Sequence, residues 1–97
     1  NIIKNIDFII LSAFDFYNPD RNPEEADYTA PIYAPIKKGN RLPQANIEQL
    51  IKEWTTTLKV PSHKLILGVP AFGRSWVMTK ASKITGLPPV LATNGSG

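Results

Sequence analysis

The hydrophobic and polar positions of the chain form two almost wholly apolar runs, one over residues 6–11 and one over residues 65–71. An apolar run without polar alternation is typical of a strand that is covered on both faces, as in the parallel sheets of α/β proteins. We therefore predict strands over residues 6–14 and 65–70. Charged and aromatic residues follow both runs, and parallel α/β proteins keep their functional sites at such strand ends.

A helix is predicted between the two strands, from its N-cap at Asn46 to Leu58. Gln49 stands three residues after Asn46, as in a capping box, and Pro61 ends the helix because the residue before proline avoids the α conformation. Apolar side chains recur at helical spacing and form a stripe that we expect to face a core. These are Ile47, Leu50, Ile51, Trp54 and Leu58.

A long connection, residues 17–45, joins the first strand to the helix and holds five prolines. Proline at this density excludes a long helix or a central strand, and a connection of this length is more typical of a functional loop or lid than of a spacer. Strand, loop, helix and strand form one βαβ unit, in which the strands are parallel. Two strands and one helix cannot cover both faces of such a sheet. The neighbours would come from a larger α/β protein, either a closed (β/α)₈ barrel or an open doubly wound sheet.

Composition excludes several classes of function. The 97 residues carry a net charge of +3, and the only adjacent basic pair is Lys37-Lys38, so nucleic acid is not the expected partner. The absence of cysteine excludes a disulfide framework and a cysteine nucleophile within this chain. No stretch approaches the roughly 20 apolar residues of a membrane helix. No Gly-rich phosphate loop follows either strand, no cofactor is predicted, and the single histidine, His63, is interpreted as a solvated turn residue.

The last part of the chain lacks the regular spacing of apolar residues seen before it. Residues 77–89 show no helical periodicity, so the second strand is not followed by a crossover helix and we expect an inserted segment there. The chain begins without an initiator methionine and ends in a Gly-rich stretch, so we expect it to be a piece of a longer protein. The stretch contains the sequon Asn94-Gly95-Ser96, which is either an Asn-Gly turn or, in a secreted protein, a glycosylation site.

Asp15 and Arg74 directly follow the two strands and are expected on the same rim, because parallel strands end at one edge of a sheet. Aromatic side chains surround them in the sequence. These are Phe14, Phe16, Tyr17, Phe72 and Trp76. Aromatic faces beside a few fixed polar groups suit a sugar, whose axial C–H faces are apolar and whose hydroxyls need hydrogen-bond partners. The alternative is an Asp–Arg pair that only stabilises the rim, above aromatic residues that belong to the core.

The strand ends read Ser12-Ala13-Phe14-Asp15-Phe16 and Phe72-Gly73-Arg74-Ser75-Trp76. They resemble the strand ends Met-Thr-Tyr-Asp-Phe and Tyr-Gly-Arg-Ser-Phe that form part of the substrate groove in family-18 chitinases. The loop sequences RNPEEADYTAPIY, at residues 21–33, and NRLP, at residues 40–43, are similar to the insect imaginal disc growth factors, a chitinase-like branch of that family. The resemblance covers nearly the whole chain.

This resemblance implies that residues 1–76 are part of a (β/α)₈ TIM barrel and supply its strand six, helix six and strand seven. Residues 77–97 would begin the small α+β domain that chitinases insert after strand seven. In the family, a glutamic acid on strand four protonates the glycosidic oxygen while the N-acetyl oxygen of the substrate attacks the anomeric carbon. The signature Asp-x-x-Asp-x-Asp-x-Glu of that strand is absent from this chain, so we predict no catalytic residue in it.

Two departures from the chitinase pattern argue against hydrolysis. Phe14 replaces a tyrosine that, in the active enzymes, donates a hydrogen bond to the attacking N-acetyl group, and Phe72 replaces the tyrosine before Gly-Arg. Loss of a donor aimed at developing charge costs about 2.7–4 kcal/mol, or about 10²- to 10³-fold in rate. Ser12 also replaces the usual methionine of the groove. We therefore hypothesise that hydrolysis has been weakened or lost.

The resulting hypothesis is a non-catalytic, secreted, extracellular chitinase-like glycoprotein of growth-factor or lectin type. The alternatives are an active family-18 chitinase that cleaves β-1,4-N-acetylglucosamine polymers, and a purely structural protein. Expected partners are a chitin-like oligosaccharide or glycan, a cell-surface receptor and the remainder of the barrel. The predicted substrate-binding residues are Asp15, Arg74, Tyr17, Trp76, Phe14 and Phe72, and the predicted glycosylation site is Asn94.

Overall fold

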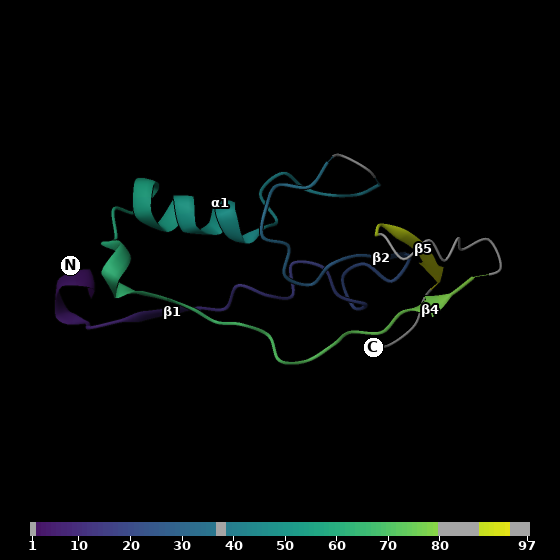
Figure 1. Cartoon of the computed structure of the whole chain (residues 1–97), viewed down its shortest axis with the longest axis horizontal. Coiled ribbons are helices and arrows are strands. Elements are labelled where there is room, and N and C mark those ends of the chain that lie inside the picture. The colour runs from purple at the N-terminus through teal and green to yellow at the C-terminus, as the bar shows by residue number, and fades with distance from the viewer. Residues whose placement is uncertain (1, 37–38, 80–87, 94–97) are drawn as a thin grey trace.

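The computed structural model describes residues 2–36, 39–79 and 88–93 of the chain. These residues form an elongated body with dimensions of 53 × 24 × 19 Å (Figure 1). Its N-terminal end holds a pair of parallel strands with a helix above them, and its other end holds a small antiparallel sheet. The long connection of residues 17–45, called the Pro-rich loop below, links the two ends.

The parallel pair consists of β1 (Ile9–Leu11) and β3 (Leu65–Leu67). Ile9 lies opposite Leu65, and the register continues to the ends of both strands. The predicted parallel pairing of the two apolar runs is therefore confirmed. It places the residues that follow both strands at the same edge, which is the arrangement that a rim site requires.

Both strands are shorter than the predicted ranges of 6–14 and 65–70, because each has a single hydrogen-bonded neighbour in the described part of the chain. The segment before β1 is a 3₁₀ helix, Ile2–Asn5. At the other end, the carbonyl oxygen of Leu11 accepts hydrogen bonds from the backbone N–H groups of both Ala13 and Gly68, and the ladder ends there.

The prediction that both strand faces are covered is not met within this chain. Ile10 is 71% exposed and Phe8 is 65% exposed, whereas Leu11 is buried. Ile66, the partner of Ile10, is also exposed. The described residues supply only one layer above these strands, the helix, so most of the apolar surface remains open to solvent.

The predicted helix is α1 (Ile47–Lys52), which continues as a π-helical turn over Glu53–Thr57. Asn46 caps it as predicted, since its side chain accepts a hydrogen bond from the backbone N–H of Gln49 at 3.0 Å. The apolar stripe is buried only at Ile47, whose exposure is 9%. The expectation that the whole stripe faces a core is thus wrong for this chain, because the strand pair is too small to cover it.

The link from the helix to β3 is a 3₁₀ turn, Ser62–Lys64. His63 is exposed in this turn, as the sequence predicted. Lys64 instead faces the N-terminal segment, where its Nζ donates a hydrogen bond to the carbonyl oxygen of Ile3 at 2.8 Å. The turn therefore ties the start of β3 to the start of the chain.

The second sheet was not predicted from the sequence. It consists of three short antiparallel strands in the order β2-β5-β4, with β2 at Glu25–Ala26, β4 at Val77–Met78 and β5 at Val90–Thr93. β2 comes from the middle of the Pro-rich loop, so the loop is not structureless (Figure 1). Through β5, it is joined to the segment that follows Trp76.

Candidate functional site

The site begins at Asp15, four residues after the end of β1. Asp15 has a φ of +57°, in the left-handed region that aspartate tolerates better than most residues because its short side chain can hydrogen-bond locally. The next residue, Phe16, donates its backbone N–H to the carbonyl oxygen of Thr29 at 3.0 Å. The chain therefore turns sharply at Asp15 and is then attached to the Pro-rich loop.

Arg74 lies opposite Asp15 and forms a bidentate ion pair with it. Arg74 Nε donates to Asp15 Oδ1 at 3.0 Å, and Arg74 Nη2 donates to Asp15 Oδ2 at 2.8 Å. The two side chains are 34% and 27% exposed, so the pair is open to solvent. The predicted meeting of these residues is confirmed, since they extend from the ends of two parallel strands.

The ion pair changes the protonation of both groups. The hydrogen bonds from Arg74 lower the pKa of the Asp15 carboxyl below its ordinary value. Burial opposes this change, and the charges of Arg74 and Arg21 add smaller contributions that also lower the pKa. The hydrogen bond to Asp15 raises the pKa of Arg74. At neutral pH the rim therefore carries a fixed carboxylate next to a fixed guanidinium.

Phe72 and Phe14 lie next to this pair and hold it from one side. The guanidinium carbon of Arg74 is 4.7 Å from the centroid of the Phe72 ring, in the range of a cation–π contact. Phe72 in turn packs against the Phe14 ring at a centroid distance of 5.6 Å and an angle of 89°, which is the favourable edge-to-face arrangement. Four of the six predicted binding residues therefore form one cluster.

Gly68 allows the two strand ends to approach closely enough for this cluster. A Cβ atom at Gly68 would lie 2.8 Å from the carbonyl oxygen of Leu11 and 3.5 Å from a ring carbon of Phe14. The first distance is shorter than real Cβ contacts, so a larger residue would push the strands apart. Close packing of backbone on backbone is a common reason for glycine at the end of a strand.

The other two predicted binding residues have different surroundings. Tyr17 is buried, and its hydroxyl accepts a hydrogen bond from the backbone N–H of Leu42 at 2.9 Å. Trp76 is half-buried and donates its indole N–H to the carbonyl oxygen of Asn22 at 2.7 Å. Both side chains attach to the Pro-rich loop. The predicted glycosylation site, Asn94, lies outside the described residues.

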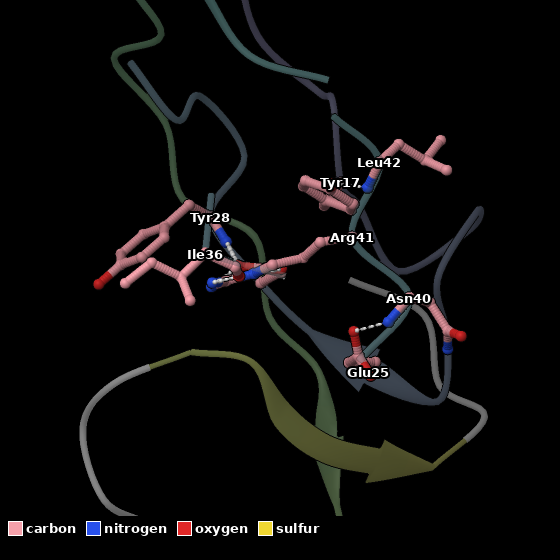
Figure 2. Close-up of polar contacts among 8 residues, drawn as sticks. Tyr17, Glu25, Tyr28, Ile36, Asn40, Arg41 and Leu42 are labelled. Atoms are coloured by element: carbon pink, nitrogen blue, oxygen red, sulfur yellow. Dashed lines mark hydrogen bonds and ion pairs between the residues drawn. The ribbon is translucent and has the colours of Figure 1, made fainter. Parts of the chain in front are cut away.

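The Pro-rich loop is closed by a buried ion pair that the sequence did not reveal. Arg41 Nε donates to Asp27 Oδ2 at 2.7 Å, and Arg41 Nη2 donates to Asp27 Oδ1 at 2.8 Å (Figure 2). The side chains are only 9% and 3% exposed. The hydrogen bond to Asp27 raises the pKa of Arg41. Local sequence patterns give no signal for this pair because the partners lie 14 residues apart in an irregular segment.

A second contact closes the same loop nearer to β2. The backbone N–H of Asn40 donates to Glu25 Oε1 at 3.0 Å (Figure 2). Gly39 precedes Asn40 with a φ of +60°, and a Cβ atom at Gly39 would overlap the Glu25 carboxylate. Glycine is therefore favoured at this position by the left-handed backbone conformation, whereas the flexible end of the Glu25 side chain could move to admit a Cβ atom. Several contacts thus cross-link the described parts of the loop.

No group of three or more histidine, aspartate or glutamate side chains is placed to hold a metal ion among the residues that the structure describes. No helix formed by them has the length and apolar character needed to cross a membrane.

The sequence that forms this βαβ unit matches a known family of proteins. The family model described as "Glycosyl hydrolases family 18" matches residues 1–96, and the chain belongs to this family. The family implies a TIM barrel, of which the described residues form a mixed α/β part.

The chain is also similar to individual chitinase-like proteins of insects. It is 42% identical over 94 residues to Chitinase-like protein Idgf4 of Glossina morsitans morsitans and 48% identical over 91 residues to Chitinase-like protein Idgf5 of the same species, covering 97% and 94% of this chain. It is 44% identical over 90 residues, or 93% of the chain, to Chitinase-like protein Idgf2 of Drosophila melanogaster. In each case the match covers 20% of the relative, so the chain spans about a fifth of their length.

Proposed function

We propose that residues 1–76 supply strand six, helix six and strand seven of a family-18 barrel, with β1 as strand six and β3 as strand seven. The parallel register of the two strands supports this assignment, as does the exposure of Ile10 and Ile66, which barrel neighbours would cover. Residues 77–97 would then begin the inserted α+β domain. The antiparallel pairing of β4 with β5 is consistent with a change of architecture after Trp76.

The proposed function of the whole protein is that of a non-catalytic, secreted chitinase-like protein that binds a chito-oligosaccharide or a related glycan at the Asp15–Arg74 rim. The names of the insect relatives support the chitinase-like assignment. The main support for a loss of hydrolysis is the packing of Phe14 and Phe72. Phe14 packs edge-to-face against Phe72, and Phe72 lies against the Arg74 guanidinium. Hydroxyl groups at these positions would be donors, whereas the Phe72 ring only packs against the arginine and the Phe14 ring only packs against Phe72.

The rim retains groups that could contact a sugar. Nε and one Nη2 hydrogen of Arg74 are used by Asp15, and its remaining N–H groups could donate to hydroxyl or N-acetyl oxygens. Asp15 retains lone pairs that could accept from hydroxyls. Because each charge is already held by the other, a sugar would meet a preorganised pair and would not have to order two free side chains.

Binding of N-acetylchitohexaose to the full-length protein, measured by calorimetry, tests this function. We expect measurable affinity that is weakened at least tenfold in Asp15→Ala and in Arg74→Ala. Ser75→Ala is the matched control, since this exposed neighbour of Arg74 has no assigned contact. Absence of binding, or equal binding by all variants, would refute the proposed groove.

Hydrolysis is tested separately with a fluorogenic chitotrioside. We expect the full-length protein to release the fluorophore at least about 10²-fold more slowly than an active family-18 enzyme, because the two tyrosine hydroxyls are absent at Phe14 and Phe72. Turnover at a rate comparable to that of an active family-18 enzyme would establish the alternative, a chitinase, in place of a binding protein.

Secretion and a glycan at Asn94 are part of the same proposal. The observation behind them is the sequon Asn94-Gly95-Ser96. The intact mass of the protein from the medium of insect cells should exceed that of Asn94→Gln protein by the mass of one glycan, and treatment with an N-glycosidase should remove this difference. Equal masses of the unmodified protein and the Asn94→Gln protein would contradict the proposed glycan at Asn94.

A further inference from the structure

A pocket of about 400 Å³ opens within the Pro-rich loop. All three tyrosines of the chain line it: Tyr17, Tyr28 and Tyr33. Tyr17 is buried at 4% exposure, whereas Tyr28 and Tyr33 are 50% and 71% exposed and form an accessible part of the lining. Prolines and small apolar residues complete the walls. The pocket therefore combines apolar surface with hydroxyl groups.

The Asp27–Arg41 ion pair also lines this pocket. The two side chains neutralise each other, so the pocket has charged groups but no net charge from them. Neither group is saturated with hydrogen bonds. Arg41 Nη1 makes only a long contact of 3.4 Å with the carbonyl oxygen of Ile36, and Asp27 Oδ2 accepts from Arg41 Nε alone among the described residues. Because the two side chains are only 9% and 3% exposed, they form the polar base of the pocket, and the accessible hydroxyls belong to Tyr28 and Tyr33.

The pocket is held in shape by neighbouring structure. The carbonyl oxygens of Pro31 and Ile32 accept hydrogen bonds from the backbone N–H groups of Ile47 and Glu48 at 2.9 Å each, which fixes one wall to the start of α1. On the other side, the Tyr17 hydroxyl holds the backbone of Leu42 (Figure 2). A ligand would thus enter a largely preformed site, which lowers the entropic cost of binding.

We propose that this pocket binds one ring of an uncharged saccharide, and that this site is separate from the Asp15–Arg74 rim. An uncharged ligand fits because the lining charges cancel. A ring with apolar C–H faces and peripheral hydroxyls fits because the accessible lining is tyrosine and proline, and the exposed Tyr28 and Tyr33 hydroxyls can both donate and accept hydrogen bonds. A volume of about 400 Å³ is within the usual range of small-molecule sites, about 300–1,000 Å³. The proposal does not depend on Asp15 or Arg74.

Saturation-transfer NMR of the full-length protein with glucose, N-acetylglucosamine, mannose and galactose tests the site. At least one sugar should receive saturation, and its affinity should fall about tenfold in Tyr28→Ala and in Tyr33→Ala, which remove the accessible rings. Ile36→Ala is the matched control, because Ile36 is exposed in the same loop but does not line the pocket. The double variant Asp15→Ala/Arg74→Ala should retain the signal, which separates this site from the rim.

Hydroxyl-radical footprinting of the full-length protein shows whether the pocket is open. Tyr28 and Tyr33 should be labelled faster than the buried Tyr17, and the bound sugar should protect them. The proposal is overturned if Tyr28 and Tyr33 are as protected as Tyr17 without sugar, since another part of the protein then covers the pocket. It is also overturned if none of the four sugars binds, or if binding is unchanged in both tyrosine variants.

Discussion

The guanidinium carbon of Arg74 lies 4.7 Å from the centre of the Phe72 ring, while two of its nitrogens hold the carboxylate of Asp15. A single arginine is thus fixed from two directions by residues at the ends of different strands. The arrangement stabilises the rim, and it also fixes which hydrogen-bonding groups face outward. A stabilising ion pair and a residual sugar site, the two interpretations of these residues, are therefore compatible.

The titration of Asp15 reports directly on this pair. Its folded pKa is lowered from 3.8, so the stabilisation from the ionised carboxylate is complete above that value and is lost as the pH falls through the lowered pKa. Carboxyl ¹³C NMR of the full-length protein should give a midpoint below 3.8. Arg74→Gln should move it back toward 3.8, whereas Arg21→Gln, which removes the smallest contribution, should change it little. A normal midpoint in the unmodified protein would contradict the bidentate geometry.

The buried ion pair of the loop should contribute far more to stability than an exposed pair. Arg41→Met leaves the Asp27 carboxylate buried without its positively charged partner and should lower the free energy of unfolding by about 3–5 kcal/mol. Chemical denaturation of the full-length protein measures this change. The control is Glu48→Gln, which breaks the exposed pair with Lys52 and should cost only about 0.3–0.5 kcal/mol.

A double-mutant cycle isolates the interaction within the buried pair. Asp27→Asn combined with Arg41→Met should cost clearly less than the sum of the two single changes, because no unpaired charge remains buried. Additive costs would mean that the two side chains act independently, contrary to the distances of 2.7 and 2.8 Å between them.

The close approach at Gly68 predicts a position-specific effect of alanine. Gly68→Ala places Cβ against the backbone of Leu11 and should destabilise the full-length protein by about 1–3 kcal/mol, as overpacking does. Gly73→Ala is the matched control, since nothing lies within 4 Å of its Cβ position, and it should be neutral or stabilising by up to about 1 kcal/mol. Equal melting temperatures for the two variants would show that the strand ends are farther apart than described.

The 97-residue chain alone should not unfold cooperatively. Ile10 and Phe8 are 71% and 65% exposed, and the edges of β1 and β3 that face away from each other have no partners in the part of the chain described. We expect a broad thermal change in the far-ultraviolet circular dichroism of the isolated chain and a sharp one for the full-length protein. A sharp transition of the isolated chain would show that these surfaces do not need neighbours.

The elements that could be predicted from sequence are those with strong local signals. The apolar runs gave the parallel strands, and Asn46 with Gln49 gave the start of α1. The rim pair of Asp15 and Arg74 followed from topology, because parallel strands place their carboxyl ends together. In these cases a rule about residue spacing or strand direction was sufficient to predict the structure.

The loop could not be predicted in the same way. β2 contains only Glu25 and Ala26, neither of which favours a strand, and it forms because Val90 and Leu91 lie beside it. The partner residues are far away along the chain. The same holds for the Asp27–Arg41 pair, whose existence depends on how an irregular backbone folds back on itself.

The pairing of β2 with β5 also has a consequence for biosynthesis. The N-terminal half of the chain leaves the ribosome first, yet β2 cannot complete its sheet until Val90–Thr93 has also emerged. During that interval β2 cannot pair with β5, and the loop is held by the contacts within it. The order of translation therefore lets the cross-links within the loop, from Phe16–Thr29 and Glu25–Asn40 to Asp27–Arg41, form before the sheet is completed.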